Sequence, residues 1–102
     1  MSSIFEQAKV ALRLKTGDSA LNEQINNLLL SGIADLDDTA GINVGELSPT
    51  SETGDNPLFA QALITYVRLH FGEPDDYDRL WRSYEMQKAN LKTAFRKDVP
   101  HG

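Results

Sequence analysis

The apolar residues of the chain are densest between positions 57 and 71, where they cover nearly the whole circumference of a helix. Pro57 suits a first helical position, because its missing N–H would be unpaired there in any case, and Gly72 followed by Pro74 ends the pattern. One stripe comprises Phe59, Leu63, Tyr66, Val67 and His70, with Leu58, Ala62 and Leu69 beside it. A helix that is apolar nearly all round is a buried one. The sequence therefore predicts a central helix, over about 57–71, on which the other elements pack.

Three further segments repeat apolar residues at the helical spacing of three and four. They predict helices over about 3–14, 19–39 and 76–97. Ser3 and Glu6 match a capping box at the start of the first helix. Gly32 lies on the apolar side of the second, where a missing side chain permits close approach of another helix. In the last helix we expect the Trp81 end to pack on the central helix and the second half to project.

Residues 42–55 have no helical period and are rich in Gly, Ser, Thr and Pro, so we expect a long loop there. Ile42, Val44 and Leu47 alternate with polar residues, which indicates a short extended segment that becomes ordered when a partner supplies an edge. The alternative is a flexible surface loop pinned by one or two apolar residues. The predicted fold is all-α: a single small domain of four helices over 1–97, followed by a flexible tail at 98–102.

Charge is distributed unevenly along the 102 residues, whose net charge is −5. Between Gly17 and Asn56 there are eight acidic residues and no basic ones, whereas Asp76 to Lys97 carries six basic and three acidic residues. We therefore predict one acidic surface and one mildly basic surface. Such polarity suits head-to-tail self-association, in which different faces of neighbouring copies meet. The alternative is that both surfaces are simply solvated.

The charged residues define two sets of candidate contacts. The candidate contacts with another copy or another protein are Arg79, Arg82, Lys88, Lys92, Arg96 and Lys97. The candidate acidic surface comprises Asp35, Asp37, Asp38, Glu46 and Glu52. The three aspartates fall in the last turn of a predicted helix, where carboxylates oppose the helix dipole. We predict no metal there, because side chains spaced D-x-D-D on a helix point apart and lack the glycine-centred loop that calcium sites use.

Candidate catalytic residues are scarce. The chain has no cysteine, no nucleophile-elbow sequence and no glycine-rich phosphate loop. Of its two histidines, His101 lies in the tail, and we interpret His70 as a buried or half-buried core residue rather than a base, since a base would need an orienting carboxylate. We expect neither an enzyme nor a cofactor. No apolar run approaches the roughly 18 residues that span a bilayer, so we expect no membrane partner.

Four stretches together resemble a known family, the head-tail connector proteins of tailed bacteriophages, also called head-completion or adaptor proteins. The stretches are VALRLKTGDSALNEQI (Val10 to Ile25), SGIADLDDTAGI (Ser31 to Ile42), PLFAQALITYVRLHFGEPDD (Pro57 to Asp76) and RLWRSYEMQKANL (Arg79 to Leu91). The resemblance implies a ring of about twelve copies beneath the portal of a filled capsid. Such a ring would extend the DNA channel, dock the next neck or tail component, and be assembled in the host bacterial cytoplasm before residing in the virion neck.

Two other classes of function remain open on the sequence. A small helical regulator that binds another protein would form one-to-one complexes. A DNA-binding regulator would bind duplexes in a salt-dependent and base-specific way, which the acidic balance of the chain disfavours. In a connector, DNA would instead pass through the ring without sequence-specific binding.

Overall fold

The computed structural model describes residues 2–13, 19–71 and 74–96, and within them four helices pack around one shared core. The elements are α1 (Ile4–Ala11), α2 (Ser19–Ala34), the π-helical turn η1 (Asp35–Thr39), α3 (Pro57–His70) and α4 (Tyr77–Ala94). The predicted all-α fold and its four helices are confirmed. The predicted helix ends at residues 14 and 97, and the predicted tail at 98–102, lie outside the described residues.

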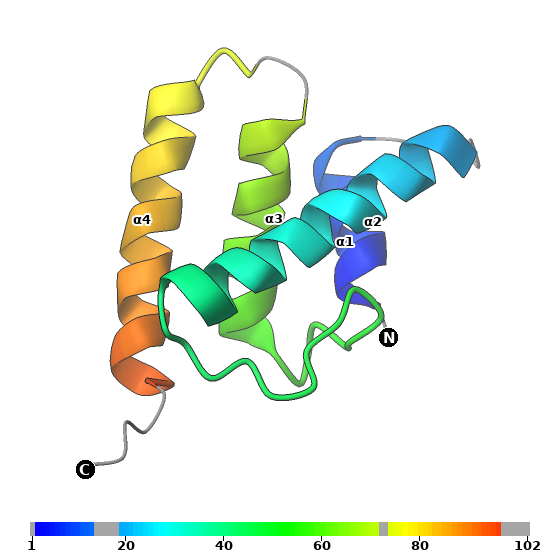
Figure 1. Cartoon of the computed structure of the whole chain (residues 1–102). Helices are drawn as coiled ribbons and strands as arrows, with labels where there is room; N and C mark the ends of the chain where they lie inside the picture. The colour runs from blue at the N-terminus through cyan, green and yellow to red at the C-terminus, as the bar shows by residue number, and fades with distance from the viewer. Residues whose placement is uncertain (1, 14–18, 72–73, 97–102) are drawn as a thin grey trace, which may run out of the picture.

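Helix α3 is the centre of the fold, as its apolar circumference predicts. Helix α4 lies antiparallel beside it, α2 crosses it, and α1 packs against it next to α2 (Figure 1). Ala60, Ala62, Leu63, Val67 and Leu69 are all buried, and together they face three neighbouring helices. Burial of this much apolar surface on one helix fixes the arrangement of the other three.

The crossing of α2 over α3 depends on Gly32. A Cβ atom at this position would lie 2.9 Å from Cδ2 of Leu63 and 3.0 Å from Cδ1 of Tyr66. Carbon atoms pack at about 3.5–4.0 Å, so only glycine fits without displacing these side chains. The close approach of another helix at Gly32, predicted from its place on the apolar side, is confirmed.

Local signals explain where the helices begin and end. At α1 the predicted capping box is present: the Glu6 N–H donates to Ser3 Oγ at 3.1 Å, and the Ser3 N–H donates to Glu6 Oε1 at 3.4 Å. Asn56 stands at the N-cap position of α3, but its side chain donates to the carbonyl of Glu52 at 3.0 Å instead of capping the helix. Gly41 adopts a φ of 67° after η1, a left-handed conformation that glycine accepts at no steric cost.

The loop from Ile42 to Asp55 is held by backbone hydrogen bonds from its own chain. The Ile4 N–H donates to the Ser51 carbonyl and the Thr53 N–H donates to the Ser2 carbonyl, at 2.9 and 3.0 Å. At its other end, the Asn43 N–H donates to the Phe95 carbonyl at 2.7 Å. The loop thus joins the start of α1 to the end of α4, along the lower edge in Figure 1. We expected a partner to provide the backbone groups that order this loop, but the chain itself provides them.

The Trp81 end of α4 packs on α3 as predicted, through Leu80 and Tyr84, although the Trp81 side chain is not part of that contact. Trp81 is 42% exposed, because Leu80, Tyr84 and Leu91 occupy the side of the helix that faces the core. Trp81 lies about 100° around the helix from Leu80 and so misses that side. The second half of α4 does not project: Leu91 is buried, and the Phe95 ring packs on Phe59 with centroids 4.9 Å apart. Both ends of α4 therefore contact the core.

His70 is exposed at the end of α3, so its predicted place in the core is wrong. Its ring lies against Tyr66, with centroids 4.3 Å apart. The helix ends at this residue, and the core-facing position of the last turn is taken by Leu69, which is buried.

Candidate assembly surfaces

The acidic candidates are distributed over two elements. Asp35, Asp37 and Asp38 lie in η1, at the end of α2, while Glu46 and Glu52 lie in the loop. Asp38 and Glu46 are exposed, and Asp35 and Asp37 are half-buried. Because α2, η1 and the loop as far as Asn56 contain no basic residue, this part of the molecule keeps its acidic character in the folded state.

Glu52 differs from the other acidic candidates. Its backbone forms an antiparallel bridge with Ser3, and its Oε2 atom is buried without a hydrogen-bond partner. Two of its neighbours, Ser51 and Thr53, bond to the start of α1. Glu52 is therefore placed at a contact within the chain and presents little of its carboxylate to a partner.

The basic candidates all lie on α4 or immediately after it. Some have hydrogen-bond or ion-pair partners within the chain, and the others do not. Arg79 forms an ion pair with Asp76, and the hydrogen bond from Arg79 holds the pKa of the Asp76 carboxyl below its usual range. Arg82 is exposed, and its Nε–H donates to the Asp78 carbonyl at 3.4 Å, a long contact. Lys88 is half-buried, with 17% of its side chain exposed.

The basic residues without a partner among the described side chains lie at the end of α4. Lys92 and Arg96 are both exposed, and within the described ranges their side chains have no hydrogen-bond or ion-pair partner. Lys97, the last of the basic candidates, lies outside the described residues. The charge that remains available to a partner is therefore concentrated in the second half of α4.

Asp35, Tyr84 and Lys88 form a polar cluster that joins η1 to α4. The Tyr84 hydroxyl donates to Asp35 Oδ2, and Lys88 Nζ lies 3.4 Å from the same oxygen and 3.5 Å from Glu85 Oε1. Lys88 Nζ also lies 5.0 Å from the centre of the Tyr84 ring, within the range of a cation–π contact. Burial, and then the nearby Asp35 carboxylate, raise the pKa of the Tyr84 hydroxyl.

This cluster corrects one prediction about the charged surfaces. Asp35 and Lys88 were assigned to separate acidic and basic surfaces, but they pair with each other inside one chain. The Tyr84 hydroxyl is the member of the cluster that the sequence did not indicate. Asp35 is separated from Tyr84 by 49 positions, so no local pattern relates them.

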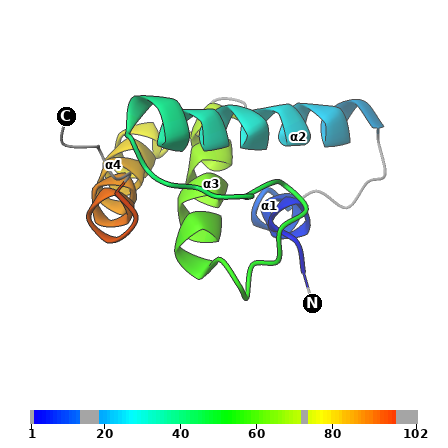
Figure 2. The same ribbon diagram turned by 60° about the horizontal axis from the view of Figure 1, so that its bottom comes forward.

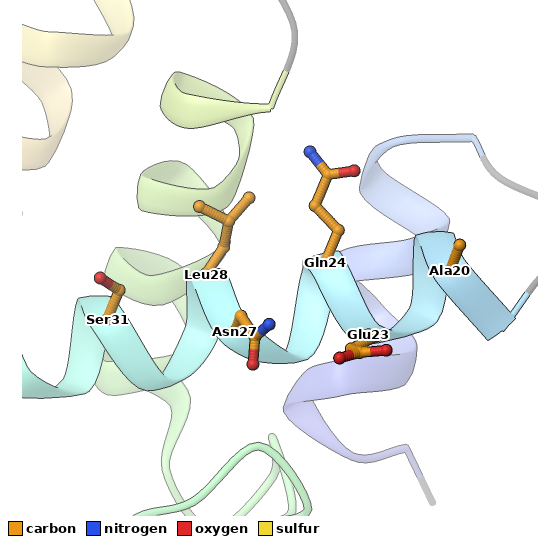
Figure 3. A pocket seen from close by; sticks show the side chains of 6 residues that line it. All are labelled: Ala20, Glu23, Gln24, Asn27, Leu28 and Ser31. Atoms are coloured by element: carbon orange, nitrogen blue, oxygen red, sulfur yellow. The ribbon is translucent and has the colours of Figure 1, made fainter.

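The outer face of α2 forms a shallow hollow of about 420 Å³, shown in Figure 3. Ala20, Glu23, Gln24, Asn27, Leu28 and Ser31 line it. Among these residues only Glu23 is charged, and it is exposed. In Figure 3 the Glu23 and Asn27 side chains point away from α1 and α3, so this face is open to a partner.

The described residues hold no group of three or more His, Asp or Glu side chains that could bind a metal ion. No helix among them is long and apolar enough to cross a membrane. Comparison of the chain with protein-family models, with curated proteins and with solved structures found no match.

Proposed function

We propose that this protein is a structural component of a tailed-phage virion, a head-tail connector that assembles as a ring under the portal. In this role it extends the DNA channel and docks a neck or tail-completion protein. The family resemblance of the sequence motivates the proposal. The observation that carries it is the separation of unneutralised charge: an acidic α2 with its loop, and a basic end of α4 in which Lys92 and Arg96 have no partner among the described side chains.

A ring requires two different contact surfaces on each copy. Copies related by rotation about a ring axis contact one another through two different patches, whereas a two-fold dimer uses one patch twice. A chain with opposite charges on different elements suits the first arrangement, because like patches repel and unlike patches attract.

The passage of DNA sets a second requirement that the acidic region suits. Lys and Arg hold duplex DNA by displacing counterions from its phosphates, and a channel lined by them would slow its passage. We assign the acidic loop, with Glu46 exposed on it, to the channel side of the ring. The channel wall would then repel the DNA and would not recognise its base sequence.

Native mass spectrometry of the purified protein over a wide concentration range, followed by electron microscopy of the largest species, tests the proposal. The expected result is a closed ring of about twelve copies, formed alone or on addition of the portal protein. A monomer or dimer that never forms rings, with or without portal, contradicts it. One-to-one complexes with another protein would then identify a small regulator.

Duplex binding provides a separate check. Fluorescence anisotropy with a labelled duplex at low salt should give no saturable binding by the isolated chain, because its net charge is −5. Base-specific binding that weakens as salt rises would instead identify a DNA-binding regulator.

A further inference from the structure

A small apolar pocket lies where the start of α3 meets the end of α4, at the lower end of both helices in Figure 1. It encloses about 150 Å³ and is lined by Asp55, Asn56, Pro57, Leu58, Phe59 and Phe95. The Phe59 and Phe95 rings pair with each other, and Leu58 and Phe95 are exposed. Sites for small molecules usually enclose about 300–1,000 Å³. This pocket therefore suits a single apolar side chain.

The only charge on the lining of this pocket is negative. Asp55 is exposed, and its carboxylate has no hydrogen-bond or ion-pair partner among the described side chains. Arg96 follows Phe95 in the chain, but it lines a different hollow together with Lys92 and Thr93. The pocket therefore favours an apolar side chain that has a positive charge beside it.

Five large apolar side chains outside the pocket are exposed within the described ranges, and they are the candidates to enter it. They are Val10, Leu30, Tyr77, Trp81 and Met86. Leu30 lies on α2, where every charge is negative, so Asp55 would repel its surroundings. Val10 is short and branched at Cβ, and the charges one turn before and after it, on Glu6 and Arg13, cancel. Neither residue meets both requirements of the pocket.

The two exposed aromatic side chains of α4 also fit the pocket poorly. Asp78 directly follows Tyr77, and Glu85 lies one turn after Trp81 on the same side of the helix. These carboxylates would come close to Asp55. The Trp81 indole is moreover large for a pocket of about 150 Å³. Met86 is the candidate that remains.

Met86 suits the pocket in shape and in charge. Its side chain is 66% exposed, and it is unbranched and flexible, so it adapts to irregular spaces. The residues one turn before and after it on the same side of α4 are Arg82, Ser83, Ala89 and Asn90. Among these only Arg82 is charged. Asp78 lies more than two turns away, and Glu85 lies about 100° around the helix, where it forms an ion pair with Lys88.

Met86 and the pocket face opposite ways on one chain. The Phe95 N–H donates to the Leu91 carbonyl, so Phe95 continues the pattern of α4. Nine positions separate Met86 from Phe95, which places them about 180° apart around the helix. Helix α4 forms one edge of the bundle in both views (Figures 1 and 2). One chain therefore cannot place its Met86 in its own pocket.

We infer that this pocket receives the Met86 side chain of a second copy of this chain, with Arg82 of that copy beside Asp55. The inference rests on the proposed ring and names its subunit contact. The Met86 thioether contacts the rings of Phe59 and Phe95, an arrangement that is favourable for sulfur. Because each copy has one such side chain and one such pocket, the same contact repeats around a ring.

Oxidation of Met86 tests the contact in the unmodified chain. Hydrogen peroxide converts the thioether to a polar sulfoxide, and peptide mass spectrometry measures the rate at residue 86. The exposed side chain of the monomer should react at least about tenfold faster than that of the assembled protein. The oxidised monomer should need a concentration at least about tenfold higher to assemble. M86L keeps the volume of the side chain and cannot form a sulfoxide, so it should assemble before and after peroxide treatment.

Charge exchange tests the pairing beside the pocket. R82E and D55K each place like charges together, so each should raise the concentration needed for assembly about fivefold. The double variant R82E/D55K exchanges the two charges and should restore assembly. R68E and D38K make the same changes at exposed positions on α3 and η1 that do not line the pocket, and should assemble like the wild type. Circular dichroism melting checks that each variant is folded before assembly is compared.

Cross-linking gives a further and independent measurement. Because the chain has no cysteine, M86C and L58C each introduce a single thiol, and any disulfide must join two copies. Both positions are exposed, so neither substitution disturbs the core. Oxidation of the mixture should give the M86C–L58C dimer. The matched control mixes L58C with S31C, which is exposed on the outer face of α2, and should not give a mixed dimer.

The outcomes separate this contact from the proposed function. Rings in which Met86 is oxidised as fast as in the monomer, or that give no M86C–L58C product, overturn the contact and leave the connector proposal standing. A product between L58C and L30C in its place assigns the pocket to α2 of the neighbour and also overturns the contact. Cross-linked open chains that never close support the contact and contradict the ring. A wild type that stays monomeric at all concentrations and gives no M86C–L58C product overturns the contact.

Discussion

Helix α2 is held at two places by two different kinds of interaction. At its middle, Gly32 lies directly on Leu63 and Tyr66, and the contact is apolar and close. At its end, Asp35 reaches Tyr84 and Lys88 of α4 through a half-buried polar cluster. The first contact leaves no space for an added atom, whereas the second depends on Asp35, the acceptor that Tyr84 and Lys88 share. The two contacts should therefore fail in different ways.

The largest effect is expected from filling the space at Gly32. In G32V the new side chain must displace Leu63 or Tyr66, and we expect a loss of about 3 kcal/mol in the free energy of unfolding. Urea denaturation followed by circular dichroism measures it. G54V is the control, because a Cβ at residue 54 meets nothing within 4 Å. Equal stability of the two variants would contradict the close packing of α2 on α3.

A smaller loss is expected from removing the carboxylate of the polar cluster. D35A leaves the Tyr84 hydroxyl and the half-buried Lys88 without their shared acceptor, which should cost about 2 kcal/mol. D38A removes an exposed carboxylate from the same π-helical turn, three positions after Asp35, and should change stability little. The same urea measurement applies, and an unchanged D35A would show that the cluster contributes nothing to folding.

Tyr84 gives the same cluster a pH dependence. Because its pKa is raised in the folded state, the unfolded chain loses the phenol proton first as pH rises. Tyr84 therefore contributes this stability below about pH 10 and loses it progressively above. Y84F should be about 1 kcal/mol less stable at pH 7 and should destabilise less steeply between pH 9 and pH 11. Parallel slopes for wild type and Y84F over that range would refute this role.

The smallest effect is expected at the exposed pair of Arg79 and Asp76. Both groups are solvated and screened, so R79Q should leave the melting temperature unchanged within error. Calorimetry measures the melting temperature, and a clear decrease in R79Q would contradict this prediction.

The same comparison shows what the sequence could and could not predict. The contact at Gly32 was predicted, because a glycine on the apolar side of an amphipathic helix has a local meaning. The contact at Asp35 was not, because its partners lie 49 and 53 positions away and no pattern relates them. The positions of the helices followed from local spacing and caps. The exposure of Trp81 and His70 depended on which neighbouring side chains fill the core-facing positions, and local spacing did not determine this. Of the candidate surfaces, the sequence supplied the charges, and the fold determined which ones were already paired.

The π-helical turn at the end of α2 also has a consequence for chain length. In this turn the Ala40 N–H donates to the carbonyl of Asp35, five positions back, so the last turn holds one residue more than an α-helical turn. Because the wider turn accommodates this additional residue, deleting one residue within 35–39 and closing a regular α-helical turn would leave Gly41 facing nearly its present direction. Deleting one residue within the regular part of α2 would instead rotate Gly41 by about 100°, and the loop would start toward the wrong side. The π-helical turn is therefore the place in this helix where the chain can lose a residue without redirecting the loop.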